Sequence, residues 1–303
     1  MLTVRSNRPL RLFAPTALLV AALVADPIPL RAQAASDRPL PETRTFLEEV
    51  RKHFHSDDYL LDQYTFTERR TEKRFDAKGK VKHEKHEVYE VYPSAQARQT
   101  YRKLVERDGR PLSAEELEKQ DHEHEKKVAK LHKSGEAAEA KRRERMAENE
   151  RREREVVDDI FGVYDIAIVR REPIEGRNAL LVTFTPRPGV KPASRRGRIL
   201  QKFTGRAWVD EADYQVVRAE AELHHTLSFG LGVLARLHEG ATATFQRRKV
   251  NGEVWLPSVA TFRGSARVFL VKGLRIDSRS EYSDYKKFNV ATETAIVPEK
   301  SAE

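Results

Sequence analysis

The sequence predicts an α+β fold whose core is an antiparallel sheet, and three observations predict it. From Gly205 to Phe288, β-branched and aromatic runs alternate with short turns. Before the first strands, apolar residues recur at helical spacing, and a long charged stretch of helical character separates two groups of strands. We therefore expect a meander with helices packed on it and one helical insertion within it.

The stretch Gly205–Phe288 is the part around which the chain is organised. Residues 210–213 (DEAD) separate a strand that ends at Val209 from one that begins at Tyr214. Asn251-Gly252 separates a strand over 243–250 from the next one at 254–256. Because both residues tolerate positive φ, the pair predicts a tight hairpin.

The chain before this stretch adds two helices and two groups of strands. A helix over Glu42–Leu61 places Phe46, Leu47 and Val50 on one face, which can pack on a sheet. A short helix near Ile199 leads into Gly205. The expected strands are Gln63–Phe75, Val81–Tyr92, Gln99–Glu106, Val163–Glu172 and Ala179–Pro186.

Residues 113–160 change character completely. They hold 12 Lys/Arg and 15 Asp/Glu with few large apolar residues, so they predict a solvated helical hairpin or one long kinked helix. Ser113 and Glu116 have the spacing of a capping box, and Ser134-Gly135 breaks the helical pattern. The apolar residues keep no heptad, which argues against a coiled-coil seam. Two roles stay open: a solvated helix, or an arm that contacts a protein partner or an anionic membrane surface.

The segment Leu227–Leu237 is unusually apolar for a connection between strands, with a single charge at Arg236. Exposed apolar segments of this kind mark contact surfaces or fold back on the protein. We therefore expect either a lid on the sheet or a contact with lipid or a partner.

Residues 1–34 have the layout of a cleavable signal peptide. Arg5, Arg8 and Arg11 precede an apolar run over 12–25, and Ala32-Gln33-Ala34 has the small-x-small pattern of a cleavage site after Ala34. The segment carries four Arg and one Asp, so the formal charge of +9 becomes +6 without it. We expect a periplasmic chain with a single domain over 35–303, too weakly basic for a dedicated nucleic-acid binder.

No motif for catalysis, metal or cofactor binding is present. The chain has no cysteine, no nucleophile elbow, no HExxH and no phosphate-binding glycine loop. The segment HEKHE at 83–87 lacks a zinc spacing, and the carboxylates at Asp210 and Asp213 stand where turns favour aspartate. His224 and His225 point to opposite faces of a strand. The sequence therefore predicts no enzyme, no cofactor and no metal.

The motif G-x-x-W-V-D-x-x-x-Y-x-V-V-R runs from Gly205 to Arg218, followed by Val254-Trp-Leu-Pro257 and by Tyr282-Ser-Asp-Tyr-Lys-Lys-Phe288. These strand motifs resemble those of the periplasmic outer-membrane lipoprotein-sorting (LolA/LolB-like) superfamily. The resemblance covers about 35–112 and 160–290. It implies a curved, unclosed antiparallel half-barrel covered by helices, whose apolar cup holds acyl chains; the insertion at 113–160 is not part of that pattern.

The resemblance implies that the protein binds lipid or lipoprotein acyl chains in outer-membrane lipoprotein sorting. The alternative is an envelope scaffold or stress-sensing protein that binds a protein partner through the sheet or the charged arm. The residues expected to line the cup are Tyr64, Phe66, Tyr89, Val91, Trp208, Val217, Leu227, Phe229, Leu231, Leu234, Phe245, Trp255 and Phe262.

Overall fold

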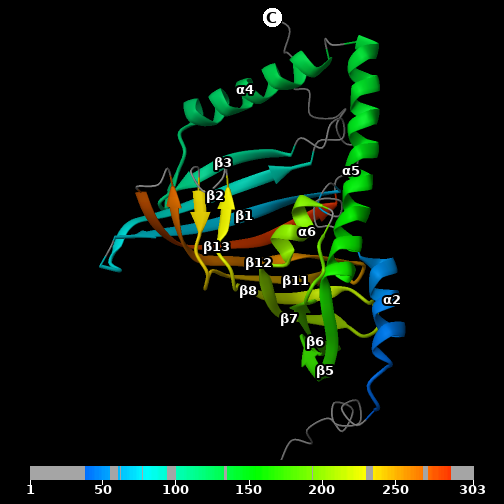
Figure 1. The fold of residues 1–303 in the computed structure, drawn as a ribbon. Coiled ribbons are helices and arrows are strands. Elements are labelled where there is room, and N and C mark those ends of the chain that lie inside the picture. The colour runs from blue at the N-terminus through cyan, green and yellow to red at the C-terminus, as the bar shows by residue number, and fades with distance from the viewer. Residues whose placement is uncertain are drawn as a thin grey trace, which may run out of the picture. The chain divides into compact units, whose positions relative to one another are not determined.

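A thirteen-stranded antiparallel sheet forms the core of the protein (Figure 1). The computed structural model describes residues 38–54, 61, 63–76, 78–93, 100–132, 135–192, 194–229, 235–268 and 272–287. Contacts within the chain group Pro39–Glu303 into one compact unit, to which everything below refers. The predicted signal peptide and its cleavage site lie outside the described residues.

The strands follow the order β4-β3-β2-β1-β13-β12-β11-β8-β7-β6-β5, and β9 and β10 lie off this path, β10 pairing with β12. The sheet is not closed, which confirms the predicted α+β fold with an open curved sheet. The strands are β1 (Tyr64–Phe75), β2 (Val81–Tyr92), β3 (Tyr101–Arg107), β4 (Arg110–Pro111), β5 (Tyr164–Ile174), β6 (Arg177–Pro186), β7 (Phe203–Asp210), β8 (Val216–Leu223), β9 (Leu227–Phe229), β10 (Ala235–Leu237), β11 (Thr242–Val250), β12 (Val254–Val268) and β13 (Lys272–Lys287).

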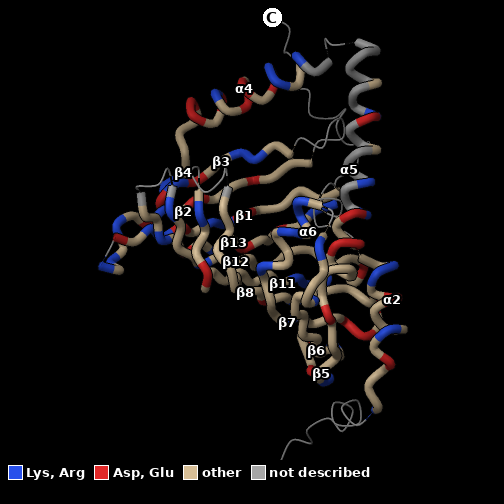
Figure 2. The backbone as a smooth tube through the Cα atoms, in the orientation of Figure 1, with Lys and Arg blue, Asp and Glu red and all other residues tan. Residues whose placement is uncertain are grey.

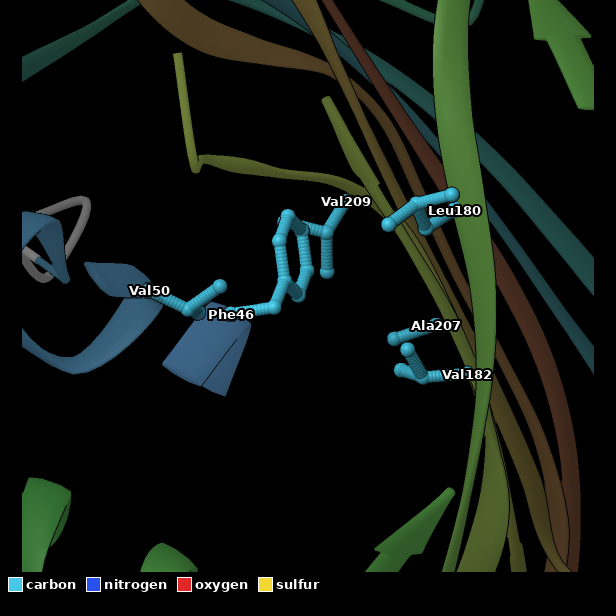
Figure 3. Close-up of a cluster of buried hydrophobic side chains, with 6 residues drawn as sticks. All are labelled: Phe46, Val50, Leu180, Val182, Ala207 and Val209. Carbon is cyan, nitrogen blue, oxygen red and sulfur yellow. The ribbon is translucent and has the colours of Figure 1, made fainter. Parts of the chain in front are cut away.

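Helix α2 (Thr43–His53) packs across the end of the sheet formed by β6 and β7. Its Phe46 and Val50 are 4% exposed and lie against Leu180, Val182, Ala207 and Val209 (Figure 3). Glu42 begins the helix by accepting hydrogen bonds from the backbone N–H groups of Arg44 and Thr45. The predicted helix over 42–61 is shorter in the structure, since it ends at His53 with extended backbone at Phe54.

The charged insertion is helical, as predicted, and forms two helices, α4 (Ala114–His132) and α5 (Gly135–Val163). The capping box is present: Ser113 N donates to Glu116 Oε2 at 3.0 Å, and Glu116 N donates to Ser113 Oγ at 3.2 Å. Acidic and basic residues are interspersed along α4 (Figure 2). The short helix α6 (Arg195–Leu200) precedes β7, with Ser194 as its N-cap.

Gln120 of α4 completes the hydrogen bonding of strand β3. Its side-chain amide accepts from Leu104 N at 3.0 Å and donates to Leu104 O at 3.0 Å. Nearby, Asp121 accepts from Tyr101 Oη, and the His124 ring stacks on the Tyr101 ring at 4.0 Å. The amide of Gln120 thus takes the place of a neighbouring strand at this position and ties the arm to the sheet.

Tight turns join the later strands. Asn251 and Gly252 have φ of 53° and 71°, so the predicted hairpin is confirmed. The loop predicted over 173–178 is tighter than expected, because Glu175 and Gly176 alone make the turn with φ of 48° and 75°. Pro173 stays within β5, which tolerates it since β5 is the last strand in the order.

Candidate functional site: the inner face of the sheet

We define the inner face as the face of the sheet on which α2 packs. Side chains of paired residues on neighbouring strands share a face, so the register extends the inner face across the whole sheet. One row of paired residues, from β2 to β5, is Glu87, Arg70, Ser280, Ala260, Phe245, Ala219, Ala207, Val182 and Ile168. The next row is Lys85, Glu72, Ser278, Phe262, Ala243, Ala221, Gly205, Phe184 and Ile166.

The chemistry of both rows changes in the same order along the sheet. On β2 and β1 the paired residues are charged, and on β13 they are serines. On β12, β11 and β8 they are alanines with two phenylalanines, and on β6 and β5 they are large and apolar. The inner face therefore has a polar end, a middle of small and aromatic side chains, and an apolar end.

The apolar end is filled by protein side chains. The residues there that lie under α2 are buried, with Leu180 at 0% and Val209 at 2% exposed. A second cluster of Leu223, Leu227 and Ala241 is buried next to Ile199 of α6. Core packing accounts for these positions.

The middle of the inner face, which we call the trough, is different. Its residues Ala219, Ala221, Ala243, Phe245, Ala260 and Phe262 are all half-buried. Small side chains keep this surface low between the covered apolar end and the polar end. The trough is thus an apolar surface that the described helices leave accessible in part.

A glycine and an aromatic ring shape the floor beside the trough. A methyl group added at Gly205 would overlap the carbonyl oxygen of Glu220 and would lie 2.7 Å from Cζ of Phe184. The Phe184 ring therefore occupies the space above Gly205, its cross-strand partner. This arrangement flattens the floor, as aromatic residues often do over strand glycines.

At the polar end, the carboxylates are less exposed to solvent than the cations that pair with them. Glu68 accepts from Arg102 at 2.6 Å and from Ser280 Oγ at 3.2 Å. Glu72 accepts from Arg70 at 3.2 Å and from Arg74 at 2.7 Å, and Lys85 pairs with Glu87 at 2.6 Å. Burial and the hydrogen bond with Glu87 raise the pKa of Tyr89, while the charges of Arg102 and Arg70 act in the opposite direction.

Seven of the predicted cup residues lie on the inner face or in its buried clusters. Tyr64, Phe66 and Val91 are buried at the β1–β2 end, where Phe66 packs against Tyr282 and Tyr285. Tyr89 lies half-buried beneath the Arg102 guanidinium, 4.2 Å from its ring centroid. Phe245 and Phe262 belong to the trough, and Leu227 is buried beside it.

Three other predicted residues, Trp208, Val217 and Trp255, do not share that surface. They form a separate buried cluster with Ala179 and Leu181. Along β7, side chains alternate between faces, so Trp208 points away from Ala207 and Val209, which contact α2. The predicted set therefore divides between two surfaces, and one cup cannot hold all of it. The predicted residues Leu231 and Leu234 lie outside the described residues. Of Phe229 only the backbone is described, and it ends β9.

The cluster around Trp208 is held by charged side chains. Asp213 accepts from Arg177 at 3.0 Å, Lys249 at 2.6 Å and Trp255 Nε1 at 2.8 Å. Burial favours the neutral acid, but these hydrogen bonds and the charges of Lys249 and Arg177 outweigh it and lower the pKa of Asp213. The aspartates of this turn therefore join β6, β7 and β11 and serve the fold.

Sequence reasoning missed the small residues of the trough. The signal was present in Arg218-Ala-Glu-Ala-Glu222, where alanines alternate with charges at the spacing of a strand. An alternating alanine is a weaker marker of a cup than an aromatic residue, so this signal is easily missed.

A separate hollow of 360 Å³ lies between α2, the end of α5 and β5. Leu47, Phe161 and Ile166 form its apolar part, and charged residues of both signs line the rest. Arg51 and Arg187 already pair there with Asp158 and Asp165. The hollow therefore shows no preference for either charge.

Two kinds of site are absent from the described part of the chain. No group of three or more His, Asp or Glu side chains is placed to hold a metal ion. None of the described helices has both the length and the apolar character that crossing a bilayer requires.

The sequence matches no protein-family model, and no curated protein matches it. Among solved structures, the chain is similar to a LolA superfamily protein from Nitrosomonas europaea, at 13% identity and a TM-score of 0.32, over 83% of this chain and 96% of that one. It is also similar to a domain described as an outer membrane lipoprotein-sorting protein from Vibrio parahaemolyticus, at 8% identity and a TM-score of 0.31, over 84% and 96%.

A third similar structure is the MucA/MucB complex of Pseudomonas aeruginosa, at 10% identity and a TM-score of 0.20, over 81% of this chain and 99% of that one. The first two bear the description of the superfamily that the strand motifs resemble. All three TM-scores are below 0.5, so the case for a function has to come from the inner face itself.

Proposed function

We propose that this protein is a non-enzymatic periplasmic binding protein whose trough holds an acyl chain of a lipid or lipoprotein. The observation that carries the proposal is the half-burial of an entire apolar surface, at Ala219, Ala221, Ala243, Phe245, Ala260 and Phe262. An apolar surface of this kind, bounded by packed elements, is a favourable place for hydrocarbon, because covering it removes it from water.

The distance from the polar end to the far strand of the trough is compatible with one chain. From β1 to β8 there are four strand-to-strand steps, two of them within the trough and two across the serines of β13, which correspond to about 19 Å at the usual spacing of about 4.8 Å. A lipid chain fills half of a bilayer's hydrocarbon core of about 30 Å and so extends about 15 Å. A chain lying across the strands would therefore fit between the polar end and α2.

The test is to fill the trough. Ala260→Leu adds volume on the inner face, and we expect it to reduce binding of dodecanol to delipidated protein by at least about ten-fold, or about 1.4 kcal/mol. Thr261→Val is the matched control, since Thr261 is the next residue on β12, points to the other face and bonds Thr244 there. The proposal fails if the wild-type protein does not bind dodecanol, or if both variants bind it as the wild type does.

A second candidate function is partner binding through the arm formed by α4 and α5. It is favoured by the exposure of the arm, since every described side chain of α4 is exposed or half-buried. An arm that serves a protein partner does not depend on the trough. A partner that binds the Ala260→Leu variant normally, together with no binding of dodecanol by wild type, would favour this candidate.

A further inference from the structure

The polar end of the inner face carries charges of both signs, but it does not present them equally. The side chains of Arg70, Arg102 and Lys85 are 39%, 40% and 52% exposed. The carboxylates they pair with, Glu72, Glu68 and Glu87, are 16%, 9% and 10% exposed. A molecule that approaches this end of the trough therefore meets cations, with their counter-charges beneath them.

The position of these cations is set by the groups below. Arg102 bonds Glu68 and lies over the Tyr89 ring, and Arg70 bonds Glu72. The buried Glu68 and the half-buried Glu72 each hold one of these arginines, and the other N–H groups of each guanidinium can donate to a ligand. Guanidinium groups suit carboxylate and phosphate because their planar forks match these anions.

The register places these cations at one end of the trough. Arg70 pairs across β1 and β13 with Ser280, and Ser280 pairs with Ala260 of the trough. Ser278 and Ser280 of β13 thus lie between the charged residues of β1 and the trough residues of β12. The order from β2 to β8 is charge, hydroxyl and hydrocarbon, which is the order of polarity along a single-chain amphiphile.

We propose that the polar end of the inner face binds an anionic headgroup, phosphate or carboxylate, of an amphiphile whose chain lies in the trough, with Arg70 and Arg102 as its ligands. This assignment rests on the proposed function, because it takes the chain in the trough as given. It goes further by naming the charge of the ligand and the end at which it enters.

The experiment compares dodecyl phosphate, dodecanoate, dodecanol, dodecyltrimethylammonium and inorganic phosphate, titrated calorimetrically into the delipidated full chain. We expect dodecyl phosphate and dodecanoate to bind at least about ten-fold more tightly than dodecanol, because hydrogen bonds to a charged headgroup are stronger than those to a hydroxyl. We expect dodecyltrimethylammonium to bind more weakly than dodecanol, and inorganic phosphate to bind far more weakly than dodecyl phosphate.

Arg70→Gln should remove most of the preference for dodecyl phosphate over dodecanol. Glu72 keeps Arg74 in this variant, so the fold is expected to persist. Arg69→Gln is the control, because Arg69 is the neighbouring residue on β1, points to the other face and bonds Ser283 there. Arg102→Lys keeps a cation opposite the buried Glu68 and should weaken dodecyl phosphate binding without abolishing it.

The outcomes separate the two proposals. Equal affinity for dodecanol and dodecyl phosphate would overturn the headgroup assignment and leave the proposed function standing. An unchanged preference in Arg70→Gln would overturn the assignment to these arginines. Inorganic phosphate binding as tightly as dodecyl phosphate would show an anion site that does not use the trough, which also overturns it. If no dodecyl compound binds, the proposed function fails and the headgroup assignment fails with it.

Discussion

At the scale of single residues, Asp213 shows how a turn residue stabilises the fold. Its carboxylate is held by Arg177, Lys249 and Trp255, so Asp213→Asn should lower the free energy of unfolding by about 1–3 kcal/mol at neutral pH, measured by urea denaturation. The pKa of Asp213 is lowered in the folded state. Its contribution is therefore fully present above the ordinary pKa of aspartate and is lost as the pH falls through the lowered value, so the two proteins should converge in acid.

Glu281→Gln is the control for this prediction. Glu281 pairs with Arg279, and both side chains are 51% exposed, so the change in unfolding free energy should stay within about 0.5 kcal/mol. A loss for Asp213→Asn no larger than that of the control would contradict a structural role for the turn carboxylate.

Single residues also mark the limit of what the sequence could predict. Asn251-Gly252 and the Ser113–Glu116 capping box were predictable because each follows from local chemistry. The face of the sheet to which the Val217 side chain points was not predictable. A β-bulge shifts the pairing of β7 and β8 between Trp208 and Val209, so alternation counted along the chain loses its phase there.

At the scale of elements, the arm is attached to the sheet through α4. Gln120→Ala removes both hydrogen bonds to Leu104, so we expect faster amide hydrogen exchange at Leu104 and a loss of about 1–2 kcal/mol in unfolding free energy. Lys119→Ala, an exposed neighbour on the same helix, should change neither quantity. Unchanged exchange at Leu104 in Gln120→Ala would show that α4 does not complete the bonding of β3.

Helices and strands were predicted well as types and less well in extent. The charged helices α4 and α5 and the strands β1, β2, β3, β5, β6, β7 and β8 were expected from periodicity and composition. Helix α2 ends earlier than its apolar spacing suggests. Strands β12 and β13 are longer than the two short segments, 254–256 and Tyr282–Phe288, by which the sequence marks them. Those long strands are held by pairing with their neighbours, and such long-range pairing leaves little trace in the local sequence.

At the scale of the whole sheet, the inner face has an order that only the register reveals. Charged residues on β1 and β2, serines on β13, alanines on β12 to β8 and large apolar residues on β6 and β5 come from distant parts of the chain. Without knowledge of which strands pair and in which register, the sequence cannot show that these residues lie in one row. The same register places Trp208 in the cluster away from the trough, so intrinsic tryptophan fluorescence is a poor reporter of a ligand there.

The most direct test of a chain-binding trough is photo-crosslinking with a diazirine-bearing fatty acid, followed by mass spectrometric mapping of the labelled peptides. We expect the labels to concentrate on the inner-face residues of β8, β11 and β12 and to be displaced by excess dodecanoate. These residues are Ala219, Ala221, Ala243, Phe245, Ala260 and Phe262. Labels confined to the cluster of Trp208, Val217 and Trp255, or spread evenly over the chain and insensitive to dodecanoate, would contradict it.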